Sequence, residues 1–168
     1  KQISEYQKVK NLFRRGKLKN DIFKDLTYFT KYKIIGDDRP DNVAFDAYSD
    51  ETLDWVVLLS NNITNIQTEW PLNHQSFYNF LIDKYGSEEE IHGIHHYETQ
   101  EVRNTDEAII VPKGLKVPQN YSIEFYDAEL ESYTTASNIT TEITNYTYEN
   151  KIEENKRNIY VLKAAYIN

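Results

Sequence analysis

The 168-residue sequence predicts an α+β fold. Apolar residues recur at helical spacing in several segments, which indicates amphipathic helices. Two short runs rich in tyrosine, isoleucine and valine, one before Gly36 and one close to the C-terminus, are typical of strands. Hydrophobic residues make up 39% of the chain and charged residues 27%, so the composition is that of a folded domain and not of a disordered chain.

The first two elements are predicted from helical spacing and from alternation. The segment SEYQKVKNLFRRGKLKNDIF predicts an N-terminal helix with an apolar stripe of Val9, Leu12 and Phe13. The segment YFTKYKIIG alternates and predicts a strand that ends at Gly36. The turn DDRP follows, and Pro40 suits the first turn of the next helix because its missing N–H costs nothing there.

Two short helices are predicted between residues 41 and 62, separated by a Ser-Asp pair. The positions at helical spacing are Val43, Ala44, Ala47 and Tyr48 in the first helix and Leu53, Val56, Val57 and Ser60 in the second. Asn61 and Asn62 end this hairpin, since asparagine tolerates the left-handed conformation. We expect the structural core of the module to include Tyr48, Trp55, Leu58 and Leu59.

Further elements are predicted in the second half of the chain. Asn73 is a suitable cap and Gly86 a suitable stop for a third helix, with one face formed by Phe77, Phe80, Leu81 and Lys84. Residues 87–90 are expected to be solvated, and residues 91–102 alternate weakly. The segment AIIVPKGLKVPQNYSIEFYD predicts short strands around a Pro-Lys-Gly turn. A helix is expected after Thr147, and NIYVLKAAYI predicts a final strand or, alternatively, a continuation of that helix.

Charge and composition exclude several classes of function. The net charge of −8 disfavours binding to a nucleic-acid backbone. Basic residues cluster in the first twenty positions, where they form either the solvated face of a helix or an arm for an acidic partner. The absence of cysteine excludes disulfides, and no apolar run approaches transmembrane length, so no membrane partner is expected. Because the chain contains no methionine, we expect it to lack its initiator residue.

The sequence carries no signature of an enzyme, and we predict neither catalysis nor a cofactor. GxSxG, HExxH and phosphate-binding glycine loops are all absent. His92, His95 and His96 suggest a metal-dependent hydrolase as one alternative. Neighbouring side chains of a strand point to opposite faces, however, so His95 and His96 are not expected to share an ion. The 14 tyrosines instead hint at an extensive contact surface.

An ordered set of motifs carries a resemblance to a known family. The motifs are Arg14-Arg15, Arg39-Pro40, Tyr48, Trp55-Val56, Leu58-Leu59, Asn61, Ile63, Trp70-Pro71 and Lys84-Tyr85-Gly86, with YENKIEENKRNIYVLKAAYI near the C-terminus. In this order they resemble the baseplate wedge protein 53 family of contractile-tailed bacteriophages. The resemblance covers the first half of the chain and about the last twenty residues, and it leaves residues 87–141 unmatched.

The family is understood to contain a LysM-like domain, so the resemblance implies a strand–helix–helix–strand unit. The implied domains are an N-terminal helical arm (1–29), the LysM-like domain (30–71 and 156–168) and a large mixed insertion with a helix and short strands (72–155). Residues 31–36 and 158–163 would then pair as the two strands of a minimal sheet beneath the helix hairpin.

The resemblance also implies a function. The chain would be a structural protein of the phage tail baseplate that joins wedge proteins and neighbouring wedges into a six-fold ring around the tail hub. Its partners would be the wedge-bundle proteins and the sheath-initiating wedge protein, and assembly would take place in the host cytoplasm. The candidate partner-binding residues, each of which could instead be core, are Arg14, Arg15, Arg39, Trp70, Phe77, Phe80 and Tyr85. The alternative function is a LysM-type module that binds peptidoglycan or another glycan.

Overall fold

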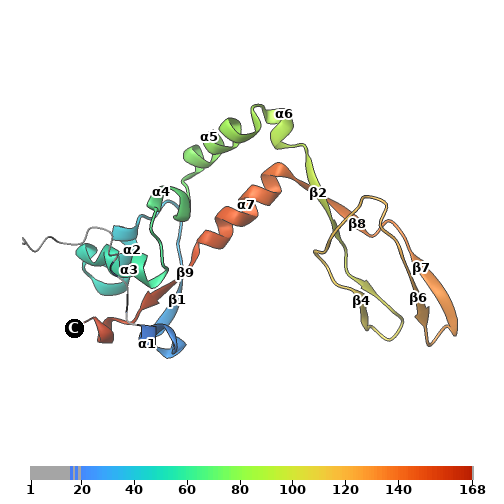
Figure 1. Cartoon of the computed structure of the whole chain (residues 1–168), viewed down its shortest axis with the longest axis horizontal. Coiled ribbons are helices and arrows are strands. Elements are labelled where there is room, and N and C mark those ends of the chain that lie inside the picture. Colours follow the sequence, from blue (N-terminus) through green and yellow to red (C-terminus); the bar gives the residue numbers. More distant parts are fainter. Residues whose placement is uncertain (1–15, 17, 19, 168) are drawn as a thin grey trace, which may run out of the picture. The chain divides into compact units, whose positions relative to one another are not determined.

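The computed structural model describes residues 16, 18 and 20–167, and the chain divides into two compact units (Figure 1). The first unit takes in the described residues up to Pro71 together with the segment from Lys156 onward, and the second runs from Leu72 to Asn155. Helices and short antiparallel strands occur in both units, so the predicted α+β class is confirmed. The predicted N-terminal helix, with Arg14 and Arg15, lies outside the described residues except for its last turn.

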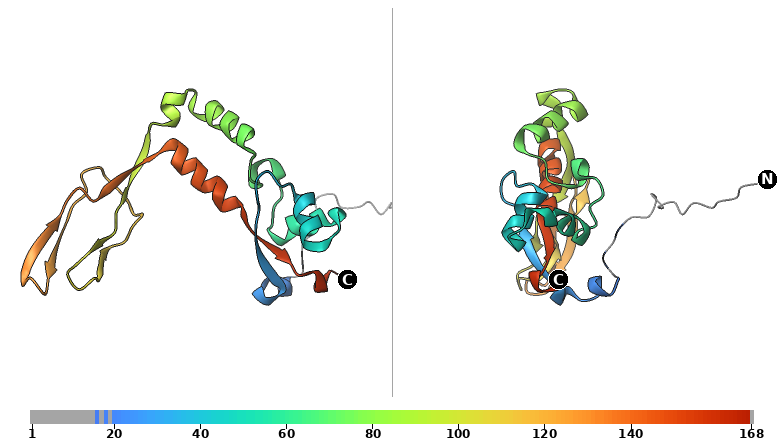
Figure 2. Two further views of the ribbon diagram at one scale, coloured as in Figure 1. Left: turned by 180° about the vertical axis from the view of Figure 1, so that it is seen from behind. Right: turned by 90° about the vertical axis from the view of Figure 1, so that its left-hand side faces the viewer.

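The first unit is built on a two-stranded sheet. Its elements are α1 (Asn20–Phe23), a 3-10 turn (Leu26–Tyr28), β1 (Phe29–Lys33), α2 (Pro40–Tyr48), a second 3-10 turn (Glu51–Leu53), α3 (Asp54–Ser60), α4 (Ile66–Glu69), β9 (Asn158–Leu162) and a last 3-10 turn (Ala164–Tyr166). β1 and β9 lie side by side (Figure 2) and pair antiparallel, with Phe29 opposite Leu162 and Lys33 opposite Asn158. The predicted pairing of two distant segments is therefore confirmed, although β1 ends at Lys33 and not at Gly36 as predicted.

The helix hairpin forms as its sequence predicts. Pro40 occupies the first turn of α2, and Ser49 ends that helix in the left-handed conformation. Asp50 then accepts a hydrogen bond from the Thr52 N–H at 2.9 Å, which starts the turn into α3. Asn62 follows α3 with a φ of 57°, as expected for a residue that stops a helix.

The core of the first unit lies between the hairpin and the sheet. It consists of Ile34, Val43, Ala44, Val57, Trp70, Ile159 and Val161, and the partly buried Tyr48 and Leu58 pack against it. Trp70 is only 5% exposed, and its indole N–H donates to the backbone oxygen of Asp38 at 2.9 Å. Trp70 is therefore a core residue, the alternative that was left open for it, and not an exposed side chain available to a partner.

The second unit combines three helices with small sheets. Its elements are α5 (His74–Tyr85), α6 (Glu88–Ile91), β2 (Ile94–Thr99), β3 (Val102–Arg103), β4 (Ile109–Val111), β5 (Lys116–Val117), β6 (Ile123–Asp127), β7 (Ser132–Ala136), β8 (Thr140–Thr144) and α7 (Asn145–Lys156). The strands pair as β5–β2–β8, β3–β4 and β6–β7. Asn73 caps α5 by accepting from the Ser76 N–H at 2.7 Å, and Gly86 ends that helix with a φ of 86°.

A small core holds α5 against α6. Phe77, Leu81 and Ile91 are buried together, with the partly buried Tyr85 packed against them. The prediction that Phe77 contacts a partner is therefore wrong, because the side chain is core. Residues 87–90 are all exposed, as expected for a solvated segment. Ser87 accepts a hydrogen bond from the Glu90 N–H, and this cap starts the helical turn α6, which the sequence did not predict.

Candidate protein-binding surfaces

The helix hairpin exposes two large aromatic side chains. α2 directs Val43 and Ala44 into the core and thereby turns Phe45 outward, with 55% of its surface exposed. α3 directs Val56 and Val57 inward and leaves Trp55 52% exposed. The prediction that Trp55 belongs to the core is wrong, because the residue lies next to the buried face of a short helix and not on it. Leu59, predicted with it, is partly buried.

Acidic side chains surround the exposed ring of Phe45. A surface hollow of about 430 Å³ is lined by Asp38, Asp41, Asn42, Phe45, Asp46 and Glu51. Arg39 lies at its border, exposed, with its Nε 3.3 Å from the Asp41 carboxylate. An aromatic ring within a charged border is the usual composition of a contact surface for another protein. We call Phe45, Trp55 and this acidic border the hairpin surface.

The sheet of the first unit has a second hollow, of about 350 Å³. It is lined by Lys31, Tyr32, Lys33, Asn158, Ile159 and Tyr160. The hydroxyl of Tyr32 donates to the Asp46 carboxylate at 3.1 Å. Burial, together with that hydrogen bond, raises the pKa of Tyr32 to about 12. Tyr32 is therefore a neutral donor at any physiological pH, and the free cations of this hollow are those of Lys31 and Lys33.

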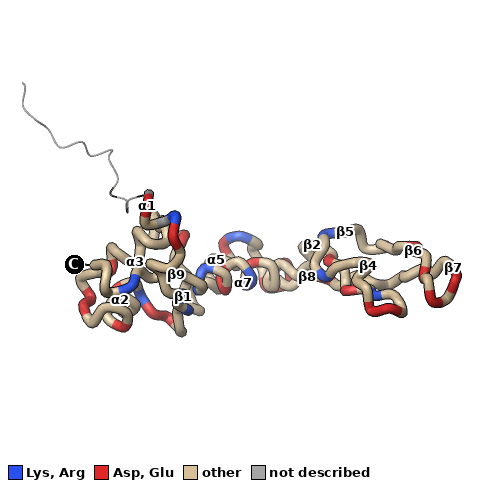
Figure 3. Tube along the Cα trace, turned by 90° about the horizontal axis from the view of Figure 1, so that it is seen from below, with Lys and Arg blue, Asp and Glu red and all other residues tan. Residues whose placement is uncertain are grey.

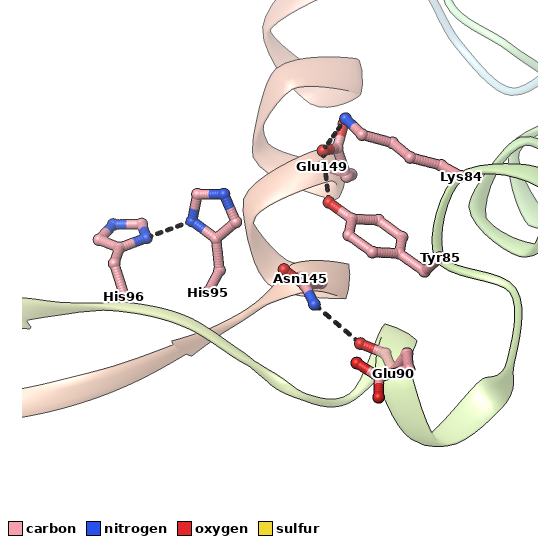
Figure 4. A network of polar contacts seen from close by, with 7 residues as sticks. All are labelled: Lys84, Tyr85, Glu90, His95, His96, Asn145 and Glu149. Atoms are coloured by element: carbon pink, nitrogen blue, oxygen red, sulfur yellow. Dashed lines mark hydrogen bonds and ion pairs between the residues drawn. The ribbon is translucent and has the colours of Figure 1, made fainter.

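A buried carboxylate joins α7 to α5 in the second unit (Figure 4). Glu149 accepts from Lys84 Nζ at 2.6 Å and from the Tyr85 hydroxyl at 2.8 Å. The hydrogen bond to Glu149 raises the pKa of Lys84, while burial and the same carboxylate raise the pKa of Tyr85. The amide of Asn145 adds a bond to the backbone oxygen of Glu90 at 2.8 Å. Tyr85, predicted to bind a partner, thus directs its hydroxyl to a contact within the chain.

The histidines are brought together by an irregularity that the sequence does not reveal. A register shift in β2 between Ile94 and His96 breaks the alternation of side chains. As a result the Nδ1 atoms of His95 and His96 lie 2.6 Å apart, which makes the prediction of opposite faces wrong (Figure 4). His95 stacks on Tyr148 with ring centroids 4.0 Å apart, and burial lowers the pKa of His95.

These histidines do not assemble a larger cluster. Within the described part of the chain, no group of three or more histidine, cysteine, aspartate or glutamate side chains is arranged to hold a metal ion. The second nitrogen of His96, Nε2, lies 3.3 Å from Glu98. Ring contacts with Tyr148 therefore connect β2 to α7, while the polar contacts of the two histidines stay within β2.

The second unit also exposes aromatic side chains. On the β6–β7 hairpin, the edge-to-face rings of Tyr126 and Tyr133 are both exposed, and so is Leu130 in the turn. Phe80, predicted to bind a partner, is 37% exposed beside the buried Phe77. Sequence reasoning did not single out the β6–β7 residues or Phe45; the excess of tyrosine was the one signal that pointed to such surfaces.

Charge is distributed unevenly along the chain (Figure 3). Residues 72–155 contain 16 acidic and 5 basic side chains, so the second unit is strongly acidic.

None of the helices among residues 20–167 is both long enough and apolar enough to span a membrane.

Exposed aromatic side chains on both units are typical of a protein that contacts other proteins. The family model described as base plate wedge protein 53 matches residues 5–168. The chain therefore belongs to the base plate wedge protein 53 family and is a structural component of the phage tail baseplate in the virion. The match includes residues 87–141, where the sequence motifs gave no resemblance. A search of curated proteins finds none that matches the chain.

Proposed function

We propose that this chain joins wedge proteins, and neighbouring wedges, into the ring around the tail hub. The partners would be the wedge-bundle proteins and the sheath-initiating wedge protein, in a six-fold assembly formed in the host cytoplasm. The role is binding without catalysis. In this proposal residues 30–71 and 156–168 act as a LysM-like module for protein contacts, and residues 72–155 are an insertion that supplies a second contact surface.

The observation that carries the proposal is the exposure of Trp55 on a module that builds its core without it. The exposed half of the Trp55 side chain stays in contact with water and gains hydrophobic free energy only when another molecule covers it. Tryptophan is also among the residues most enriched at the energetic centres of protein interfaces. The acidic border around Phe45 and the exposed Arg39 lie in the same unit and are polar groups of the kind that surround such centres. We assign the hairpin surface to a protein partner on this basis.

The sheet hollow, lined by Tyr32 and Tyr160, keeps the glycan-binding alternative testable, because aromatic rings also serve as platforms for sugars. The two functions predict different partners. A structural joint should be retained on the other wedge proteins of the same phage and not on purified peptidoglycan.

The test is co-purification of the full chain with those wedge proteins. We expect Trp55→Ala to lower retention at least tenfold, since truncating an interface centre costs about 2 kcal/mol or more. Trp55→Phe is the matched control, because it keeps an aromatic ring at the same position, and it should retain most of the binding. A folded Trp55→Ala variant that is retained like the unaltered chain would contradict the assignment. A chain that ignores the wedge proteins and is retained by peptidoglycan would contradict the function.

A further inference from the structure

The outer edge of β1 has unpaired backbone groups. The backbone N–H of Ile34 donates to the backbone oxygen of Arg157, and that of Lys163 donates to the backbone oxygen of Tyr28. These two bonds show which residues of β1 direct their backbone groups toward β9. Every second residue of β1 faces β9, so Thr30 and Tyr32 bond inward. The backbone N–H and C=O groups of Lys31 therefore point away from the sheet. Within the described part of the chain they have no hydrogen-bond partner.

The opposite edge of the sheet is closed. The backbone N–H of Tyr160 in β9 donates to Oδ1 of Asn61 at 2.8 Å, and its carbonyl accepts from Nδ2 of Asn61 at 2.8 Å. One side-chain amide thus supplies both bonds that a further strand would make at Tyr160. The sheet can be extended at Lys31 and not at Tyr160.

The side chains along β1 restrict what can add there. Lys31 and Lys33 are both exposed and stand on the same face of the strand, beside the hollow lined by Tyr160 and Asn158. Two copies of β1 placed edge to edge would bring these lysines together, which is a common way of preventing self-pairing. A strand with carboxylates at alternate positions would place opposite charges beside them.

We propose that the outer edge of β1 binds an extended acidic segment of another baseplate protein as a third strand. This inference rests on the proposed function for the nature of the partner. Main-chain hydrogen bonds at Lys31 supply the affinity, and the ammonium groups of Lys31 and Lys33 select carboxylates on the added strand. The surface is distinct from Trp55 and Phe45, so the chain would hold its partners at more than one place.

Amide hydrogen exchange of the full chain, alone and in the co-purified wedge complex, tests the inference. In the free chain the amides of Lys31 and Lys33 should exchange fast while Thr30 and Tyr32, bonded to β9, exchange slowly. In the complex we expect exchange at Lys31 to slow at least tenfold. A complex that retains the chain while Lys31 exchanges at the free rate would overturn the inference and leave the proposed function intact. Failure of the unaltered chain to form the complex would instead overturn the proposed function.

Two variants sharpen the test. Lys31→Pro removes the outward N–H and leaves the bonds to β9 in place, and we expect it to weaken binding at least tenfold with an unchanged melting temperature. Lys31→Gln, the matched control, keeps the N–H and should weaken binding less. A folded proline variant that binds like the unaltered chain would refute the proposal. If that variant does not fold, amide exchange at Lys31 of the unaltered chain in the complex tests the proposal instead. Slowed exchange at Lys31 in the chain alone at high concentration, or with peptidoglycan, would also refute it.

Discussion

The two tryptophans of the first unit should differ sharply in their contribution to stability. Trp70 is 5% exposed and Trp55 is 52% exposed, and both lie in the same compact unit. We therefore predict that Trp70→Ala strongly lowers the free energy of unfolding of that unit, while Trp55→Ala lowers it by about half as much.

The magnitudes follow from the buried area. A tryptophan side chain offers up to about 250 Å², so burying nearly all of it corresponds to an upper limit of about 6 kcal/mol. Measured truncations of buried tryptophan cost about 3–5 kcal/mol, and Trp70→Ala also leaves the Asp38 carbonyl without its indole donor. Trp55→Ala removes about half of that area, an upper limit of about 3 kcal/mol, opens no cavity and gains a few tenths of a kcal/mol in helix propensity, so its net cost is about 2 kcal/mol.

Urea denaturation followed by fluorescence measures both values, because each variant keeps the other tryptophan as a reporter in the first unit. With a slope of about 2 kcal/mol per molar urea, Trp70→Ala should lower the midpoint by about 2 M and Trp55→Ala by about 1 M. The emission of the Trp70→Ala variant should also lie at longer wavelength before unfolding, since only the exposed ring remains. Equal midpoint shifts, or a larger shift for Trp55→Ala, would refute the assignment of core and surface.

Three further predictions follow from the polar contacts. Asn61→Ala removes both bonds to Tyr160 and should cost about 1–3 kcal/mol, with faster exchange of the Tyr160 amide; an unchanged urea midpoint would contradict this. Folding raises the pKa of Lys84 and of Tyr85, so their contribution to stability is complete below pH 10 and is lost as the pH rises through the folded-state pKa values. In an alkaline stability series this loss should be smaller for a Glu149→Gln variant, which lacks the carboxylate but keeps Tyr85 buried. Folding lowers the pKa of His95 from 6.5, so stability present above that pH should fall in acid, and His95→Phe should remove the acid loss.

The elements that the sequence predicted well are those specified by local chemistry. Pro40 at the start of α2, Asn73 before α5 and Gly86 after it act through backbone groups a few residues away. Such local signals do not depend on the rest of the fold. The antiparallel pairing of β1 with β9, by contrast, was implied by the family resemblance, and the need of an apolar helix face for a sheet agreed with it.

The wrong predictions for single side chains have a common physical origin. The direction of a side chain depends on its exact position along the helix or strand and not on residue type alone. Trp55 directly precedes the buried Val56 and Val57, and a rotation of one residue along α3 is enough to turn it to solvent. The same holds in β2, where one register shift places His95 against His96. Trp70 follows a four-residue helix, and only the distant Asp38 carbonyl explains why its indole is buried.

The two edges of the β1–β9 sheet differ, because one is closed by a side chain of the same chain and the other is open. This difference indicates that the open edge of β1 has a binding function. On β9, Asn61 supplies both partners of Tyr160, so the fold closes that edge with its own side chain. One comparable amide beside Lys31 would close β1 as well, but the described chain places none there. The lysines deter pairing between copies while leaving the backbone groups free for another strand. The β1 edge disfavours a second copy of itself, because lysines would meet lysines, and it favours a strand that carries carboxylates. This selectivity, together with the closed edge of β9, supports the proposed third strand more strongly than exposure alone.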